Sequence, residues 1–304
     1  MAVDPQIVAL VNRMPELDVE AEAPKDAPKA KGKDAPDGKP KRKPPVTGKL
    51  TGPPWADAAA IYDAILAKGV PGVAAVIDMI QAVDDGTDYK ARYTLAGLGA
   101  YVVRPGKEAA RAAVIGALAA ALGGDRPKTI QAFLIRQLQF VGDKGAVPAL
   151  AKCLADADVG RDAVAALVAI RQGAAEALRA ALPGAAGPNR LAILQALGVL
   201  KDAASLAAMK AAAADPDREI RLAAVWGLSQ LADPSAVDVV IKASGADEWE
   251  RIKAAQACLA MAENLLAAGR KADAVRIYTH LRDTRTDKSE AYLRDLAEKA
   301  LAAK

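Results

Sequence analysis

The sequence predicts an all-α protein, specifically an α-solenoid (alpha-alpha superhelix) of stacked antiparallel helix pairs. Hydrophobic residues make up 52% of the chain but aromatic residues only 4%. The abundant alanine favours helices, because alanine has the highest helix propensity. No stretch shows the sustained alternation that is typical of strands. Five leucines follow one another at intervals of 29, 30, 31 and 31 residues: Leu138, Leu167, Leu197, Leu228 and Leu259. A repeat of about this length is expected of stacked helical units.

The first 54 residues contain one short helix followed by a linker. Residues 5–14 are predicted to form a helix with Pro5 in its first turn, which defines an N-terminal segment 1–20. Residues 21–54 carry nine Lys and Arg against four Asp and Glu, with almost no large apolar side chain. Such a composition cannot bury enough surface to offset the entropy of ordering, so we expect a disordered or extended linker. The chain carries a net charge of +4, so the remaining residues sum to −1.

Residues 55–126 are predicted to form irregular helical repeats. Apolar residues at helical spacing and closing glycines predict helices over 56–67, 71–83, 89–103 and 107–122. The spacing from Leu98 to Leu138 is 40 residues, longer than the later period. Gly97 and Gly99 lie inside a predicted helix and follow no strand, so they indicate close packing or a kink rather than a dinucleotide site.

Regular repeats follow over 127–262, and a different helical unit over 263–304. Asp217 is the expected N-cap of the 217–231 helix, and the charged outer side of the last helix suits a terminal cap. The predicted helices are 127–141, 146–155, 159–171, 174–182, 188–200, 203–214, 217–231, 234–243, 249–268, 272–282 and 289–303.

Two segments resemble known repeat families. Residues 215–237 (DPDREIRLAAVWGLSQLADPSAV) resemble the short bacterial, lyase-type HEAT repeats in their Asp215-Pro216 turn, their Ile220-Arg221 pair and their closing Leu228 and Leu231. The later string AENLLAAGRKADAVRIYTHL is similar to a tetratricopeptide unit, whose packing positions correspond to Leu265, Gly269, Ala272, Ala274 and Tyr278. These resemblances imply a partner-binding surface without naming the partner.

Trp226 and Trp249 are the candidate partner-binding aromatics. Trp226 precedes Leu228 by two residues and therefore points roughly 200° away from it around the helix. Its counterparts in other repeats are Gln195, Ala165 and Arg136, so this position is not committed to the core. Trp226 is either a binding hot spot or a filler of the gap between the third and fourth pairs. Trp249, and more distantly Tyr278, could share one surface with it.

Basic residues allow two interpretations at two places. Arg190 and Arg221 each lie seven residues before a marker leucine. They form either an Asp–Arg ladder with Asp202 and Asp233 or a basic stripe that binds an acidic peptide or a phosphate. In the linker, Lys41, Arg42 and Lys43 are either a contact for an anionic surface or nucleic acid, or part of a solvated tether.

The sequence offers little catalytic chemistry. The single histidine, His280, is expected on the surface, and Cys153 and Cys258 are expected to be buried, reduced thiols. One histidine and two distant cysteines do not make a typical four-ligand zinc site, so no metal, cofactor or catalytic residue is predicted.

The predicted function is therefore a non-catalytic scaffold or protein–protein interaction module that binds a protein or peptide. Two alternatives are a HEAT-type enzyme (a lyase, or one like a DNA glycosylase) and an accessory domain of a secreted or periplasmic bacterial assembly. The near-neutral folded part predicts no specific nucleic acid. No apolar stretch reaches the roughly 20 residues of a membrane span. A monomer is favoured, and the compartment is cytoplasmic for the chain as it stands, or periplasmic or secreted if a leader was removed.

Overall fold

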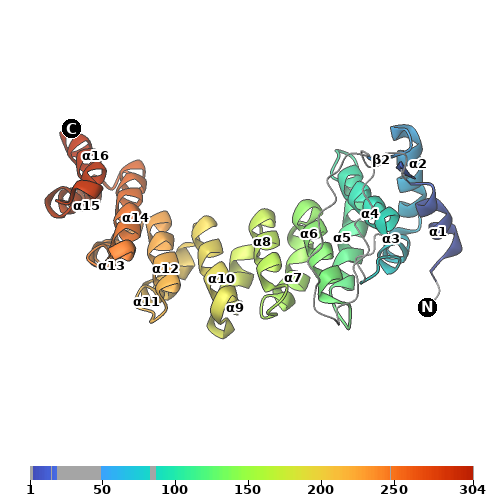
Figure 1. Ribbon diagram of the computed structural model, residues 1–304, viewed down its shortest axis with the longest axis horizontal. Coiled ribbons are helices and arrows are strands. Elements are labelled where there is room, and N and C mark those ends of the chain that lie inside the picture. Colours follow the sequence, from blue (N-terminus) through green and yellow to red (C-terminus); the bar gives the residue numbers. More distant parts are fainter. Residues whose placement is uncertain (1–2, 15, 19–48, 83–86, 247, 304) are drawn as a thin grey trace, which may run out of the picture. The chain divides into compact units, whose positions relative to one another are not determined.

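The computed structural model describes residues 3–14, 16–18, 49–82, 87–246 and 248–303. Helices dominate these residues and pack as adjacent antiparallel pairs, so the predicted all-α solenoid class is confirmed (Figure 1). The chain divides into two compact units, Met1–Ala146 and Val147–Lys304. Lys41, Arg42 and Lys43, together with most of the predicted linker, lie outside the described residues.

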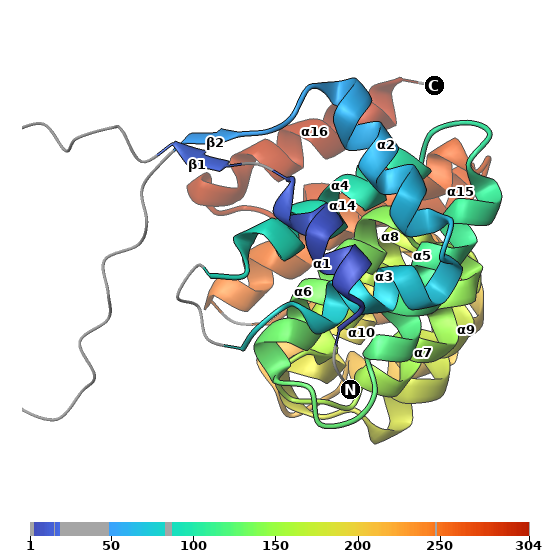
Figure 2. The same ribbon diagram turned by 90° about the vertical axis from the view of Figure 1, so that its right-hand side faces the viewer.

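The first unit holds six α-helices among its described residues. Helix α1 packs against α2, α3 and α4, and Asp4 caps α1 by accepting the Gln6 backbone N–H at 2.9 Å (Figure 2). Helix α3 ends at Asp78, earlier than predicted, and beyond its end the Asp88 carboxylate accepts the Gln81 N–H at 2.9 Å. The helices, followed by the short 3-10 helix η1, are α1 Pro5–Asn12, α2 Trp55–Leu66, α3 Gly69–Asp78, α4 Tyr89–Val102, α5 Glu108–Ala121, α6 Lys128–Val141 and η1 Lys144–Ala146.

Two short strands were not predicted from the sequence. Strand β1 (Glu16–Asp18) pairs antiparallel with β2 (Lys49–Thr51), and Leu17 lies opposite Leu50. Strand β2 falls within the predicted linker 21–54, and β1 within the segment 1–20. Three residues are too few to show an alternating pattern, and each strand depends on a partner far away in the sequence.

Gly97 and Gly99 serve helix packing, as one interpretation of the sequence expected. A Cβ at Gly97 would lie 1.9 Å from the Tyr62 hydroxyl, and one at Gly99 would lie 2.9 Å from Cγ1 of Val141. Both glycines therefore let α2 and α6 approach α4 closely.

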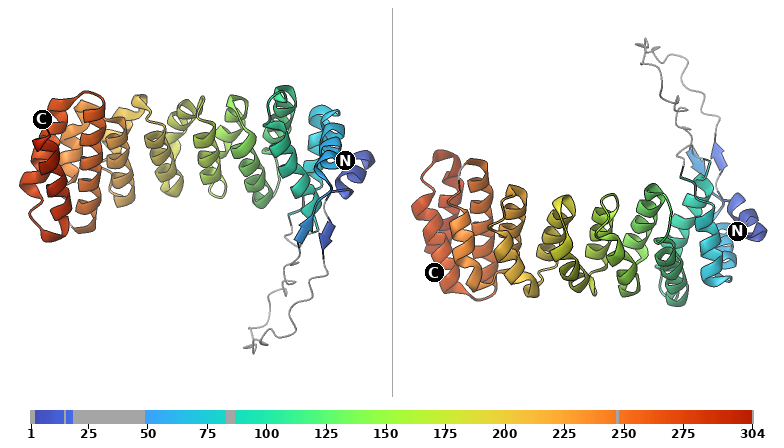
Figure 3. Two further views of the ribbon diagram at one scale, coloured as in Figure 1. Left: turned by 90° about the horizontal axis from the view of Figure 1, so that it is seen from above. Right: turned by 90° about the horizontal axis from the view of Figure 1, so that it is seen from below.

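The second unit contains five helix pairs among its described residues. Helices α8, α10, α12 and α14 pack against one another in series, and each is the second helix of its pair (Figure 3). The boundaries lie within a few residues of the predicted ones, and Asp217 caps α12 by accepting the Glu219 N–H at 2.8 Å. The pairs are α7 Val147–Cys153 with α8 Gly160–Ile170, α9 Ala174–Ala181 with α10 Gly187–Val199, α11 Leu206–Ala212 with α12 Arg218–Leu231, α13 Val237–Ala243 with α14 Glu248–Ala267, and α15 Lys271–Thr284 with α16 Ala291–Ala302. The 3-10 helices are η2 Leu182–Gly184, η3 Ala203–Ser205, η4 Pro234–Ala236 and η5 Lys288–Glu290.

The leucine series holds through α12 and then shifts by one residue. Four members of the series are 0% exposed: Leu138 in the first unit, and Leu167, Leu197 and Leu228 in the second. Leu259 is only partly buried, and Cys258 takes the core position at 0% exposure. The expectation that Leu259 continues the series is therefore wrong, because α14 turns Ala255, Cys258 and Ala262 toward the core.

Both cysteines are free and buried, as predicted. Burial raises the pKa of Cys258 to about 11, so this thiol stays protonated at neutral pH.

Among the described residues, no single helix is long and apolar enough to cross a membrane. Helices α2 and α3 meet the length and composition criteria only together, and they are bent by 110° at their junction.

Close approach of α10 and α12 makes Gly198 intolerant of a side chain. A Cβ there would lie 2.7 Å from Cζ3 of Trp226 and 3.0 Å from the Gly227 Cα. We expect Gly198→Ala to lower the free energy of unfolding by about 1–3 kcal/mol, because overpacking outweighs the gain in helix propensity. Chemical denaturation with a spectroscopic readout measures this difference.

Gly227→Ala is the matched control for Gly198→Ala. Its Cβ would lie 2.8 Å from Sδ of Met209, a flexible side chain that can move aside. The loss should therefore be smaller than at Gly198. Equal stability of Gly198→Ala and the unmodified chain would contradict the close contact between α10 and α12.

Candidate functional site

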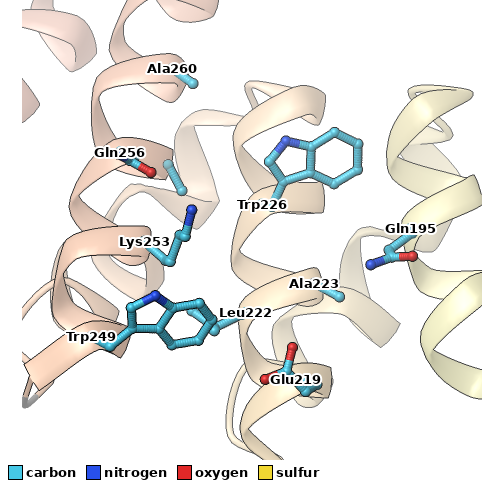
Figure 4. Close-up of a pocket in the computed structure, with 10 residues that line it drawn as sticks. Gln195, Glu219, Leu222, Ala223, Trp226, Trp249, Lys253, Gln256 and Ala260 are labelled. Carbon is cyan, nitrogen blue, oxygen red and sulfur yellow. The ribbon is translucent and has the colours of Figure 1, made fainter. Parts of the chain in front are cut away.

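A pocket of about 450 Å³ lies on helices α10, α12 and α14 of the second unit. Figure 4 shows Trp226 and Leu222 on the middle helix, flanked by Trp249, Lys253 and Gln256 on one side and Gln195 on the other. Its walls combine two indole rings with amide and charged groups. The lining residues are Gln195, Glu219, Leu222, Ala223, Trp226, Trp249, Lys253, Gln256, Ala257 and Ala260.

Trp226 is packed on one edge and open on the other. Its six-membered ring lies over Gly198 of α10, and the side chain as a whole is half-buried. This tight contact is with the preceding pair, and on the side of the fourth pair Trp226 lines the pocket. Its counterpart Gln195 also lines the pocket, and so does Gln256, which follows Trp226 by 30 residues. Equivalent positions on α10, α12 and α14, the second helices of three successive pairs, therefore form one surface.

Trp249 is the more exposed of the two tryptophans, at 46%. The Arg218 guanidinium carbon lies 5.0 Å from the centroid of its ring, and the Lys253 ammonium lies 5.9 Å away. Both distances fall within the range of cation–π attraction. The structure thus brings Trp226 and Trp249 to one pocket, with two cations beside the outer ring.

Tyr278 does not share this surface. It lies on α15 at 4% exposure, where burial raises its pKa, so its suggested place beside the tryptophans is wrong. Instead Tyr292 of α16, 43% exposed, borders the pocket by accepting a 3.0 Å hydrogen bond from the Gln256 amide. The sequence carried no signal for Tyr292, because it lies outside the repeated pattern.

Arg190 and Arg221 form ion pairs with the next helix pair. Arg190 contacts Asp215 at 2.7 Å. Arg221 holds Glu250 through two hydrogen bonds of 2.8 Å, and Arg221 lowers the pKa of Glu250. Arg251, seven residues before Cys258, continues this arginine ladder by pairing with Glu290. The ladder's third arginine was missed because the sequence pattern pointed to Leu259 as the marker.

The predicted partners of this ladder, Asp202 and Asp233, are wrong. Asp202 pairs with Arg179 of α9, and Asp233 accepts a hydrogen bond from the Ser235 N–H at 2.8 Å. Asp202 follows the last turn of α10 whereas Arg190 lies in its first turns. A helix of 13 residues separates its ends by roughly 20 Å.

His280 is half-buried rather than at the surface, which corrects the expectation. Its Nε2 lies 2.9 Å from the Ser244 hydroxyl oxygen, across the packing of α13 with α15. Burial and the charge of Arg285 lower its pKa, so the neutral imidazole is favoured. Within the described ranges, no group of three or more His, Cys, Asp and Glu side chains could hold a metal ion.

Comparison with protein-family models supports the repeat architecture. A protein-family model described as HEAT repeats matches residues 175–260, a range that contains every pocket-lining residue. A solved structure, the complex of CpcE and CpcF of phycocyanin lyase from Nostoc sp. PCC7120, is similar at 22% sequence identity and a TM-score of 0.40. The similarity covers 75% of this chain and 94% of that one. A search of curated proteins found no significant match.

Proposed function

We propose that this protein is a non-catalytic scaffold that binds a partner protein through the pocket of Trp226 and Trp249. The observation that carries the proposal is the convergence of two partly exposed tryptophans from different helices on one pocket. Tryptophan is enriched among residues that dominate binding energy.

The polar groups of the pocket suit recognition. Gln195 and Gln256 each carry both donors and an acceptor, which can satisfy the backbone of a bound segment. Arg190 and Arg221 are not part of this proposal as contacts, since carboxylates of the protein already match their charges. They support the pocket instead by holding consecutive helix pairs in register.

The proposal also gives each part of the chain a role. Residues 127–262 act as the HEAT-like scaffold, 55–126 as its irregular N-terminal extension and 263–304 as a tetratricopeptide-like cap. The buried side chains of Leu265, Ala274 and Tyr278 support the cap assignment, and so does the positive φ of 74° at Gly269. Ala272 is exposed and departs from that family's packing pattern.

Affinity capture from the native host tests the function. We expect the full chain to retain a partner and both Trp226→Ala and Trp249→Ala to weaken its binding. A hot-spot loss of about 2 kcal/mol corresponds to roughly thirtyfold in affinity. Trp249→Ala separates binding from folding better than Trp226→Ala does. A residue as exposed as Trp249 should contribute about 0.5 kcal/mol or less to stability.

Trp55→Ala provides the matched tryptophan control. Trp55 belongs to the first unit and is 50% exposed, close to the 46% of Trp249. Retention of the partner by Trp55→Ala and its loss by Trp249→Ala would support the pocket. If the variants keep the circular dichroism of the unmodified chain and all bind the partner equally, the proposed function is rejected.

A further inference from the structure

We propose that the pocket selects a partner segment in which a carboxylate lies beside a bulky apolar side chain. This inference rests on the proposed function and specifies the chemistry of the ligand. The apolar side chain would lie against the indoles, and the carboxylate would reach Arg218 and Lys253.

Among the side chains that the structure describes at the pocket and over the ring of Trp249, two carry a positive charge and one a negative charge. Lys253 and Glu219 line the pocket, and Arg218 lies over the indole ring. The next ion pair, between Arg221 and Glu250, is already closed by two hydrogen bonds and adds no net charge. A segment with an acidic group thus complements this end of the pocket, whereas a basic segment is repelled.

Arg218 can exchange its present partner for a ligand. Its contact with Glu219 is 3.4 Å long, and the two side chains are 57% and 51% exposed. Exposed pairs of this kind contribute little to stability, so their guanidinium remains available. A carboxylate placed at the ring of Trp249 would gain a charge-assisted hydrogen bond, which is the stronger kind.

The floor of the pocket leaves depth for a large apolar group. Ala223 and Ala257 line the pocket at 6% and 5% exposure, and their short side chains take up little of its volume of about 450 Å³. Leu222 and Trp226 complete an apolar wall on α12. Aromatic or aliphatic side chains of the ligand therefore bury their surface here while the acidic group stays at the rim.

A random peptide library displayed on phage and selected on the full chain tests this inference. We expect the enriched peptides to carry Asp or Glu close to Trp, Phe, Leu or Ile. The best peptide is then made with a fluorescent label, together with a version in which Gln and Asn replace its acidic residues. Fluorescence anisotropy gives the affinity of both peptides for each variant.

The Arg218→Gln and Lys253→Gln double variant should bind the acidic peptide about tenfold more weakly and the neutral peptide unchanged. Lys242→Gln, an exposed lysine outside the pocket lining, should leave both affinities unaltered. Added salt should weaken the binding of the acidic peptide only, because salt screens the attraction between opposite charges. Trp249→Ala should weaken both peptides.

The outcomes separate this inference from the proposed function. Peptides that need Trp226 and Trp249 but show no acidic preference overturn the inference and leave the function standing. An acidic preference that survives the Arg218→Gln and Lys253→Gln double variant also overturns it. The same holds for peptides that bind independently of both tryptophans, or for a dimer in sedimentation that Trp249→Ala abolishes. The proposed function fails only if the captured host partner ignores the tryptophan variants.

Discussion

Glu290→Gln is expected to lower the free energy of unfolding of the C-terminal helices by about 3–5 kcal/mol. The Glu290 side chain is 3% exposed and lies between Arg285, 4% exposed, and Arg251. Removing its charge leaves the Arg285 guanidinium buried without a counter-ion, and that desolvation is not compensated. Chemical denaturation gives the total loss, and hydrogen exchange should show it concentrated in α15 and α16.

Glu298→Gln is the control for Glu290→Gln. Glu298 is exposed on α16, and the same chemical change there should alter stability by about 0.5 kcal/mol or less. A double variant, Arg285→Met with Glu290→Leu, should recover part of the loss because it removes both buried charges together. A cost at Glu290 as small as that at Glu298 would show that the buried pair is not important for the cap.

Leu228→Ala is expected to lower the free energy of unfolding by about 2–5 kcal/mol. Leu228 is 0% exposed on α12, which packs against α10, α11 and α14. The cavity would lie in the middle of the stacked pairs, and stability in such arrays depends on contacts between neighbours. We therefore expect a lower denaturation midpoint and a less cooperative transition.

Leu259→Ala distinguishes the structure from the sequence pattern. By spacing alone, Leu259 is equivalent to Leu228, and the two substitutions should then cost the same. Because Leu259 is only partly buried, the structure predicts a clearly smaller loss there. Leu266→Ala, at a site 46% exposed on the same helix, should change stability least. Equal losses at Leu228 and Leu259 would contradict the one-residue shift in α14.

The pocket could be predicted from the sequence only in part. Trp226 was identified as a non-core position because its counterparts are polar or small, and Trp249 as a possible neighbour. Lys253, Leu222 and Tyr292 were not, because their place in or next to the pocket depends on how α12, α14 and α16 pack. The helical period gives the direction of a side chain around its own helix but not which side chain of the next helix it meets.

The sequence by itself determined the all-α class, the helix pairs and their approximate ends, because helical periodicity, alanine propensity and capping residues are local properties. The tertiary structure alone decided the partners of the arginine ladder, the burial of His280, the shift from Leu259 to Cys258 and the pairing of β1 with β2. Each of these depends on which residues distant in the chain come within a few ångströms of one another. That distance is set by the packing of whole helices, and no single segment encodes it.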